Sequence, residues 1–177
     1  MKRVMHIAAW ISVILTVLNI LLCALYDIEL AEVLAITFGT TAYHLLMRLL
    51  VGWVFDKLMH NKANYHKKWY QQSKWESKLY QRLRVREWKG KMPTYDPECF
   101  NPRKHTWGEI AQAMCQAELV HEVIVLLSFV PIIAAYWFGV LPVFIITSVL
   151  AACCDMMFVV MQRYNRPRVI RLAEHGK

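Results

Sequence analysis

Glu118 and His121 are the residues whose types and spacing best suit proton transfer. Residues three apart on a helix are neighbours, so the Glu118 carboxylate can fix the tautomer of the His121 imidazole and raise its basicity. Such an imidazole can take a proton from a substrate hydroxyl. The spacing therefore predicts a catalytic base at His121, with a purely structural pair as the alternative.

A second candidate site is the segment 162–168. It gathers positive, phenolic and amide side chains, namely Arg163, Tyr164, Asn165, Arg166 and Arg168. Guanidinium groups match the geometry of phosphate and carboxylate. We expect this segment to bind a phosphate of coenzyme A, phosphopantetheine or a lipid head group, whereas simple membrane anchoring would not need Asn165. Because Arg166 precedes a proline, the sequence also predicts that a helix ends there.

Three further polar residues, His44, Arg48 and Asp155, lie inside apolar stretches. A charged group near the centre of a bilayer costs from about 2.5 to more than 10 kcal/mol, so such residues require an explanation. We expect them to meet the Glu118–His121 pair in one polar pocket and to contact substrate there. The structural alternatives are snorkelling of Arg48 to the head groups, an ion pair of Asp155 with an arginine, and an interhelical hydrogen bond of His44.

The elements that must position these residues are apolar helices. The 177 residues are 57% hydrophobic and only 19% charged, which is unlike a soluble domain. A helix needs roughly 20 residues to cross about 30 Å of hydrocarbon. The sequence predicts an all-α polytopic membrane protein, a single domain over residues 1–177. Its four expected spans are about 4–25, 33–55, 119–138 and 140–161.

The distribution of lysine and arginine predicts the orientation of these spans. Basic residues flank the first and last spans and crowd the middle segment 56–108, whereas the two remaining turns carry none. Because short basic segments resist translocation, both termini, the middle segment and the basic tail 162–177 should be cytoplasmic. We expect a multi-pass protein of the bacterial inner membrane.

The middle segment interleaves aromatic and basic residues, and Trp75, Leu79 and Leu83 recur at helical spacing. This pattern is typical of an amphipathic helix in the head-group layer, which makes membrane lipids the expected partner. A docking face for an acidic acyl carrier protein is the alternative, and no nucleic acid is expected as a partner. Thr106 and Glu109 have the spacing of a capping box and predict where the next helix begins.

Common soluble catalytic frameworks are missing from the sequence. No G-x-G-x-x-G, Walker, G-x-S-x-G or H-E-x-x-H pattern occurs. The five cysteines lack the spacing of a disulfide framework or a zinc site. We therefore expect neither a metal nor a resident cofactor.

From residue 84 to residue 171, about half of the chain, three blocks occur in the order of a known family. They are V-R-E-W-K with Arg86, Trp88 and Lys89, then A-E-L-V-H with Ala117, Glu118, Leu119 and His121, and finally Q-R-Y-N-R-P-R. This segment resembles the glycosyl-4,4'-diaponeurosporenoate acyltransferases. These are small bacterial membrane proteins that esterify a sugar on a C30 carotenoid with a fatty acyl chain.

The resemblance implies a role in carotenoid biosynthesis, with acyl-CoA or an acyl carrier protein thioester as donor and a glycosylated or isoprenoid lipid as acceptor. It implies a base at His121 oriented by Glu118, and substrate contacts from Trp88 and Lys89. The three arginines of the tail, Arg163, Arg166 and Arg168, would hold the donor, with Asn165 or Tyr164 near the developing oxyanion. Two other functions stay open: another small membrane transferase, such as a methyltransferase, and a non-catalytic subunit whose charges pair with partner helices.

Overall fold

Four long helices dominate the computed structural model, which describes residues 2–175. They are α1 (Lys2–Tyr26), α2 (Glu29–Met59), α5 (Trp107–Leu127) and α7 (Leu141–His175). Two short helices, η4 (Val130–Ala134) and α6 (Ala135–Phe138), extend α5 toward α7. The four predicted spans and the all-α fold are confirmed: four helical segments are long and apolar enough to cross a membrane, and the described residues contain no strand.

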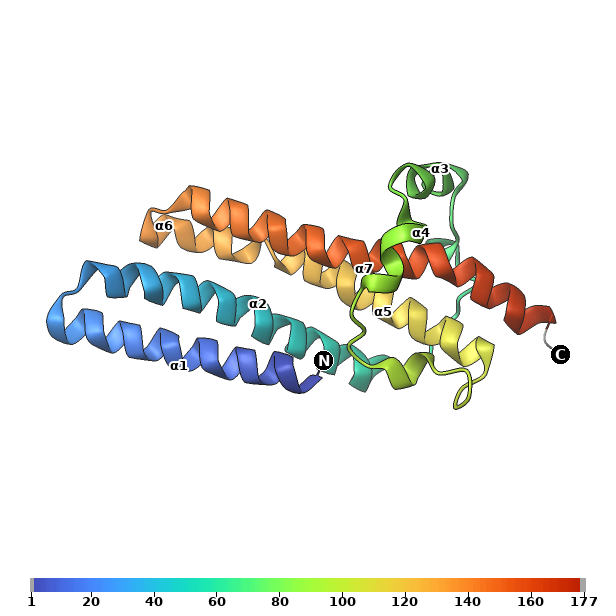
Figure 1. Cartoon of the computed structure of the whole chain (residues 1–177), viewed down its shortest axis with the longest axis horizontal. Helices are drawn as coiled ribbons and strands as arrows, with labels where there is room; N and C mark the ends of the chain where they lie inside the picture. Colours follow the sequence, from blue (N-terminus) through green and yellow to red (C-terminus); the bar gives the residue numbers. More distant parts are fainter. Residues whose placement is uncertain (1, 176–177) are drawn as a thin grey trace.

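The long helices form two antiparallel pairs, α1 with α2 and α5 with α7, and α2 packs against α5 (Figure 1). The turn between α1 and α2 and the turn between α6 and α7 lie at one end of the bundle. Both ends of the chain and the middle segment lie toward the other end. This common end is the one that the basic residues predict to be cytoplasmic.

Small and self-bonded polar residues let α1 and α2 approach closely. Ala9, Ser12 and Asn19 are buried on α1. The Ser12 hydroxyl donates to the carbonyl of Ala8 at 2.9 Å, and the Asn19 amide donates to the carbonyl of Leu15 at 2.8 Å. Polar side chains that bond their own helix need no water, so they are compatible with a hydrocarbon environment.

The middle segment forms a series of short helices, of which α3 and α4 pack against α7 and η3 packs against α5. They are η1 (Lys68–Tyr70), α3 (Lys74–Arg82), α4 (Val85–Trp88), η2 (Lys89–Lys91) and η3 (Pro97–Phe100). The predicted amphipathic helix is α3, where Trp75 is 66% exposed while Tyr80 is buried. An exposed tryptophan on a basic surface helix is what an interfacial helix presents to lipid head groups.

The predicted start of α5 is confirmed. The Thr106 hydroxyl accepts from the backbone N–H of Glu109 at 3.3 Å, and the Glu109 carboxylate accepts from the backbone N–H of Thr106 at 2.8 Å. This reciprocal capping box satisfies two N–H groups that a helix start otherwise leaves unpaired. The third span thus begins in the helix that this cap opens.

The predicted end of the last helix at Arg166 is wrong, because α7 continues through Pro167 to His175. Proline has a backbone φ that suits a helix and removes only one backbone N–H donor there. The turns beyond it are supported by side chains: Arg171 donates to the carbonyl of Pro167 at 3.4 Å, and a ring nitrogen of His175 lies 2.9 Å from the carbonyl of Arg171. The preference of a residue before proline for an extended backbone therefore does not end this helix.

Candidate active site

Three helices contribute one residue each to a cluster around Asp155. The Nδ1 atom of His121 on α5 lies 2.9 Å from Oδ1 of Asp155 on α7. Arg48 on α2 forms an ion pair with the other carboxylate oxygen. The Arg48 guanidinium also donates to the carbonyl of His44 at 2.8 Å, which fixes its direction. We call His121, Asp155 and Arg48 the inner cluster.

The geometry of the inner cluster determines where the proton of His121 lies. Asp155 is 2% exposed and is paired with Arg48. A charged carboxylate only accepts hydrogen bonds, so Nδ1 of the neutral imidazole carries the proton and donates it. Nε2 is then an unprotonated acceptor. Phe158 stacks on the ring, with centroids 4.6 Å apart and planes at 8°, and holds its orientation.

Glu118 has other partners than the His121 that the sequence suggested. It is fully buried and accepts from Arg163 at 2.8 Å, while its second oxygen pairs with Arg166. Arg166 is 1% exposed, and its Nε donates to the backbone carbonyl of Tyr70 at 3.1 Å. Within residues 2–175 no hydrogen bond joins Glu118 to His121. The tautomer of His121 is fixed by Asp155, and Glu118 instead joins α5 to α7 and to the middle segment.

Arg163 extends this ion-pair network to α3. Its Nε lies 2.9 Å from Oε1 of Glu76, whose other oxygen accepts from the backbone N–H of Ser73 at 2.6 Å. Burial opposes ionisation, but the Ser73 N–H and the Arg163 guanidinium outweigh it and lower the pKa of Glu76. Burial and the nearby Glu76 charge raise the pKa of Tyr80 to about 12. We call Glu76, Glu118, Arg163 and Arg166 the clamp, because they fasten the middle segment to α5 and α7.

A basic surface lies further along α7. The ammonium of Lys89 bonds to the amide oxygen of Asn165 and lies 4.7 Å above the ring of Tyr164. Burial, followed by the positive charges of Arg168 and Arg86, lowers the pKa of Lys89. Since these cations repel one another, an anion bound among them would be stabilised. We call Lys89, Asn165 and Arg168 the anion surface; Arg168 is exposed there.

An open hollow continues the anion surface toward the end of α7. It has a volume of about 440 Å³ and is lined by Arg168, Arg171, Leu172 and His175. Trp88 directly precedes Lys89, and its indole N–H donates to the carbonyl of Leu83 at 3.0 Å. That bond stabilises the short turn that carries Lys89. The arrangement can bind phosphate groups at the membrane surface.

Two buried polar side chains lack hydrogen-bond partners among the described residues. Both ring nitrogens of His44 are buried and unpaired, and so is the hydroxyl of Ser148. Arg48 contacts Ala151 and Asp155 on α7, so one turn back on each helix His44 and Ser148 lie at about the same level. An unpaired buried polar group costs free energy, which indicates that water or a polar ligand group belongs at this level.

Residues 66–175 match the family described as glycosyl-4,4'-diaponeurosporenoate acyltransferase, and the match covers more than half of the chain. The chain belongs to this acyltransferase family. No curated protein and no solved structure matches the chain. The matched part of this acyltransferase family member contains His121, Asp155, the clamp and the anion surface, while His44 and Arg48 precede it.

The structure thus distributes the predicted site residues of this acyltransferase family member over three groups. His44, Arg48, His121 and Asp155 gather in or beside the inner cluster; Glu118, Arg163 and Arg166 belong to the clamp; Trp88, Lys89, Tyr164, Asn165 and Arg168 lie at or beside the anion surface. Sequence reasoning missed Glu76, Tyr70 and Phe158. Only Glu76 left a signal, the Ser73–Glu76 spacing of a capping box, and that spacing gives no hint of Arg163.

No group of three or more potential metal ligands of the His, Cys, Asp and Glu types occurs in residues 2–175. The cysteines in this part of the chain are free thiols. The inner cluster offers an imidazole, a carboxylate and a guanidinium, which are groups that can act through acid–base and charge effects.

Proposed function

We propose that this protein moves a fatty acyl group from a thioester donor to a hydroxyl group of a glycosylated or isoprenoid lipid. The observation that carries the proposal is the contact of the His121 imidazole with the buried Asp155 carboxylate, within the part of the chain that matches the acyltransferase family. An imidazole oriented by a buried carboxylate is a recurrent device for activating a hydroxyl group.

In this mechanism Nε2 of His121 takes the proton of the acceptor hydroxyl as its oxygen attacks the thioester carbonyl. The new C–O bond forms, the tetrahedral intermediate collapses, and the C–S bond breaks. The departing thiolate takes the proton back from His121, so the imidazole ends as it began. Asp155 stabilises the imidazolium between the two steps, and transfer is direct, without a covalent enzyme intermediate.

Arg48 is assigned to hold the Asp155 carboxylate in place for the imidazole. It shares the Asp155 carboxylate with His121, and its side chain is 19% exposed, so the charge is only weakly screened by water. Asn165 was expected near the developing oxyanion from the sequence. It lies seven residues beyond Phe158 on α7, about 10 Å along the helix axis. We therefore assign Asn165 to donor binding instead.

The donor phosphates are assigned to the anion surface. Phe158, Asn165 and Arg168 follow one another at spacings of seven and three, so they share a face of α7. Phe158 and Arg168 are about 15 Å apart along the axis. A donor that reaches both must be extended, as the pantetheine arm of coenzyme A and of acyl carrier protein is. Arg163 and Arg166, occupied by the clamp, position the elements that carry this surface.

The donor reaches the site from the cytoplasm and the acceptor from the bilayer in this proposal. The termini, the basic middle segment and the anion surface are assigned to the cytoplasmic side of the bacterial inner membrane, in agreement with the positive-inside rule. The exposed Trp75 of α3 holds the middle segment in the head groups. Its basic residues also offer a docking face for an acidic acyl carrier protein.

The internal pairing of the intramembrane charges favours an enzyme over a non-catalytic subunit. Arg48 pairs with Asp155, and Glu118 pairs with Arg163 and Arg166, all within this chain. A scaffold that recruits partner helices through its charges would leave such groups unpaired. The orphaned nitrogens of His44 beside the inner cluster instead fit a site that receives a small polar group.

The test is transfer of radiolabelled acyl chains from acyl-CoA or acyl carrier protein to a glycosylated lipid by the purified protein in lipid nanodiscs. His121→Ala should reduce turnover at least about 100-fold, because general-base catalysis contributes that much or more. His6→Ala, at an exposed histidine of α1, is the matched control and should keep wild-type turnover. Full activity of a folded His121→Ala variant would remove this residue from the mechanism.

A further inference from the structure

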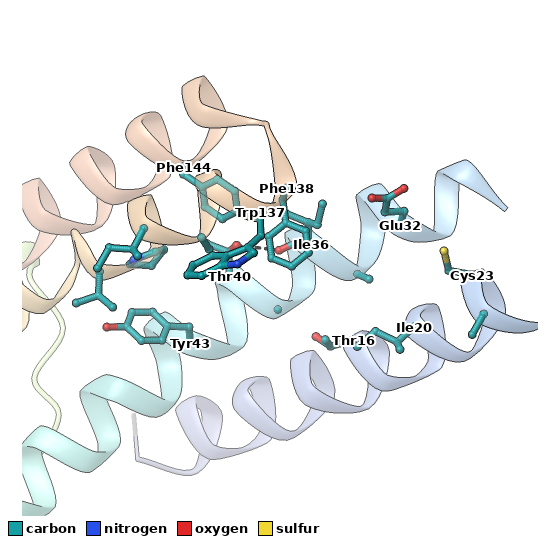
Figure 2. A pocket seen from close by; sticks show the side chains of 17 residues that line it. Thr16, Ile20, Cys23, Glu32, Ile36, Thr40, Tyr43, Trp137, Phe138 and Phe144 are labelled. Carbon is teal, nitrogen blue, oxygen red and sulfur yellow. Dashed lines mark hydrogen bonds between the residues drawn. The ribbon is translucent and has the colours of Figure 1, made fainter. Parts of the chain in front are cut away.

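An apolar cleft of about 720 Å³ lies between the two helix pairs, at the end of the bundle away from the termini. Figure 2 shows Thr16 and Ile20 on α1 and Ile36 on α2 facing this space, with the rings of Trp137 and Phe144 on its other side. The cleft is separate from the anion surface and contains none of the residues assigned to chemistry above.

The three hydroxyl groups that line the cleft are already paired. The Thr16 hydroxyl donates to the carbonyl of Ser12 at 2.7 Å, and the Thr40 hydroxyl donates to the carbonyl of Ile36 at 2.8 Å. Tyr43 donates to the carbonyl of Leu127 at 2.9 Å. With its hydroxyls satisfied internally, the wall offers hydrocarbon and aromatic surface to a ligand, so an apolar chain is the chemistry that fits.

The length of the cleft limits its occupant. On α2 the lining extends from Glu32 to Tyr43, which is about 17 Å at 1.5 Å per residue. The hydrocarbon layer of a bilayer is about 30 Å thick, so one leaflet of acyl chains fills about 15 Å. One fatty acyl chain therefore fills the cleft, whereas a long polyene that crosses the whole layer would extend beyond it.

The inner end of the cleft leads to the inner cluster. Tyr43 lines the cleft and is followed by the buried His44, and Arg48 lies one turn further on α2 in contact with Asp155. The His44 ring, whose nitrogens are unpaired, lies with its centroid 5.5 Å from that of the Tyr43 ring and one turn before Arg48 on α2. A ligand with an apolar tail and one polar carbonyl or hydroxyl group matches this order along α2, in which an apolar wall is followed by polar side chains.

We propose that the cleft binds the fatty acyl chain of the donor and that its depth sets the preferred chain length. The inference rests on the proposed acyl transfer. The thioester lies at the level of His44 and Arg48, the phosphate-bearing arm runs toward Arg168, and the terminal methyl group points toward Glu32. The donor then lies along α7 and α2 in one extended line, and the acceptor approaches His121 from the bilayer.

A substitution that shortens the cleft tests this assignment. Ala35 lines the cleft near its outer end, so Ala35→Phe should lower turnover of the longest saturated acyl donors about tenfold relative to wild type while shorter donors keep theirs. Val33→Phe is the control, because Val33 is 60% exposed on the same helix and is absent from the cleft wall. An unchanged chain-length profile in Ala35→Phe, with wild-type turnover intact, would overturn the inference.

Photo-crosslinking tests the same assignment without a measurement of turnover. An acyl-CoA with a diazirine at the end of its chain is bound to the protein in nanodiscs. The sample is irradiated, and the labelled peptides are then mapped. Label on residues that line the cleft, such as Ala35, Gly39 and Trp137, reduced by excess unlabelled acyl-CoA, supports the assignment. Label that excess acyl-CoA does not displace, or label only on lipid-facing residues such as Val33, identifies ordinary bilayer lipid and refutes it. Specific label without any turnover would instead contradict the proposed function.

Discussion

His121 and Asp155 meet across the α5–α7 interface at 2.9 Å, although 34 positions separate them in the chain. The contact leaves Nε2 of the imidazole free and places the charge of Arg48 on the far side of the same carboxylate. The buried Asp155 carboxylate thereby positions both the imidazole of His121 and the guanidinium of Arg48.

Asp155→Asn tests whether the carboxylate, and not merely a polar side chain, is required. The amide cannot stabilise the imidazolium, so turnover should fall by about 10²–10⁴-fold while binding of the acyl donor is retained. Turnover and equilibrium binding of labelled acyl-CoA are measured on the same preparation. Asn at this position with turnover near wild type would show that His121 does not depend on a charged partner.

Removing one member of the buried clamp should affect stability more than chemistry. Arg166→Ala leaves the fully buried Glu118 short of one partner, a change that typically costs 3–5 kcal/mol. Denaturant unfolding in detergent measures the loss, and Arg82→Ala, at an exposed arginine of α3, is the control. Equal unfolding midpoints for the two variants would contradict a structural role for Arg166.

Acid should loosen the attachment of α3. The pKa of Glu76 is lowered in the folded protein, so the unfolded chain binds the additional proton first as the pH falls. The contribution of Glu76 to stability is therefore complete above its ordinary pKa of about 4.3 and is lost as the pH falls through the lower folded value. Glu76→Gln should show a shallower loss of stability over this acid range, measured by thermal unfolding at stepped pH. An identical pH slope in both proteins would be evidence against the Glu76–Arg163 pair.

The anion surface should govern affinity for the donor. Removal of a phosphate contact that is equally strong in ground and transition states raises KM and leaves kcat unchanged. We expect Arg168→Ala and Lys89→Ala to raise KM for acyl-CoA about tenfold each, an effect that added salt reproduces in the wild type. Arg84→Ala, at an exposed residue of the same segment, should leave KM unaltered. A loss of kcat alone in the two variants would instead assign them to the chemical step.

Local patterns explain how much of the fold could be predicted from sequence. Long apolar runs predict the spans, and the Thr106–Glu109 cap depends on residues three apart. Both features can therefore be recognised from a short stretch of sequence. Pro167 led to a wrong prediction of the helix end. The residue before a proline prefers an extended backbone, but this local preference is weak, and the long helix and its side-chain contacts override it.

The candidate site was predicted by composition but not by pairing. Glu118 and His121 are neighbours on α5, yet each faces a different group on α7: Arg163 and Arg166 in one case and Asp155 in the other. Helical spacing gives only neighbours on one helix, while these choices depend on how α5 and α7 are rotated against each other. Partners such as Phe158, an apolar residue in an apolar helix, carry no sequence signal at all.

The unbroken course of α7 has a mechanical consequence. Its 35 residues give a rod of about 52 Å, far longer than the roughly 30 Å of hydrocarbon around it. The Asp155 carboxylate and Arg168 of the anion surface both lie on this one helix. A change in bilayer thickness tilts the helix as a whole, so the distance between these two residues stays the same. In the proposed mechanism, α7 therefore fixes the distance between the donor phosphates at the anion surface and the reacting groups at His121 and Asp155.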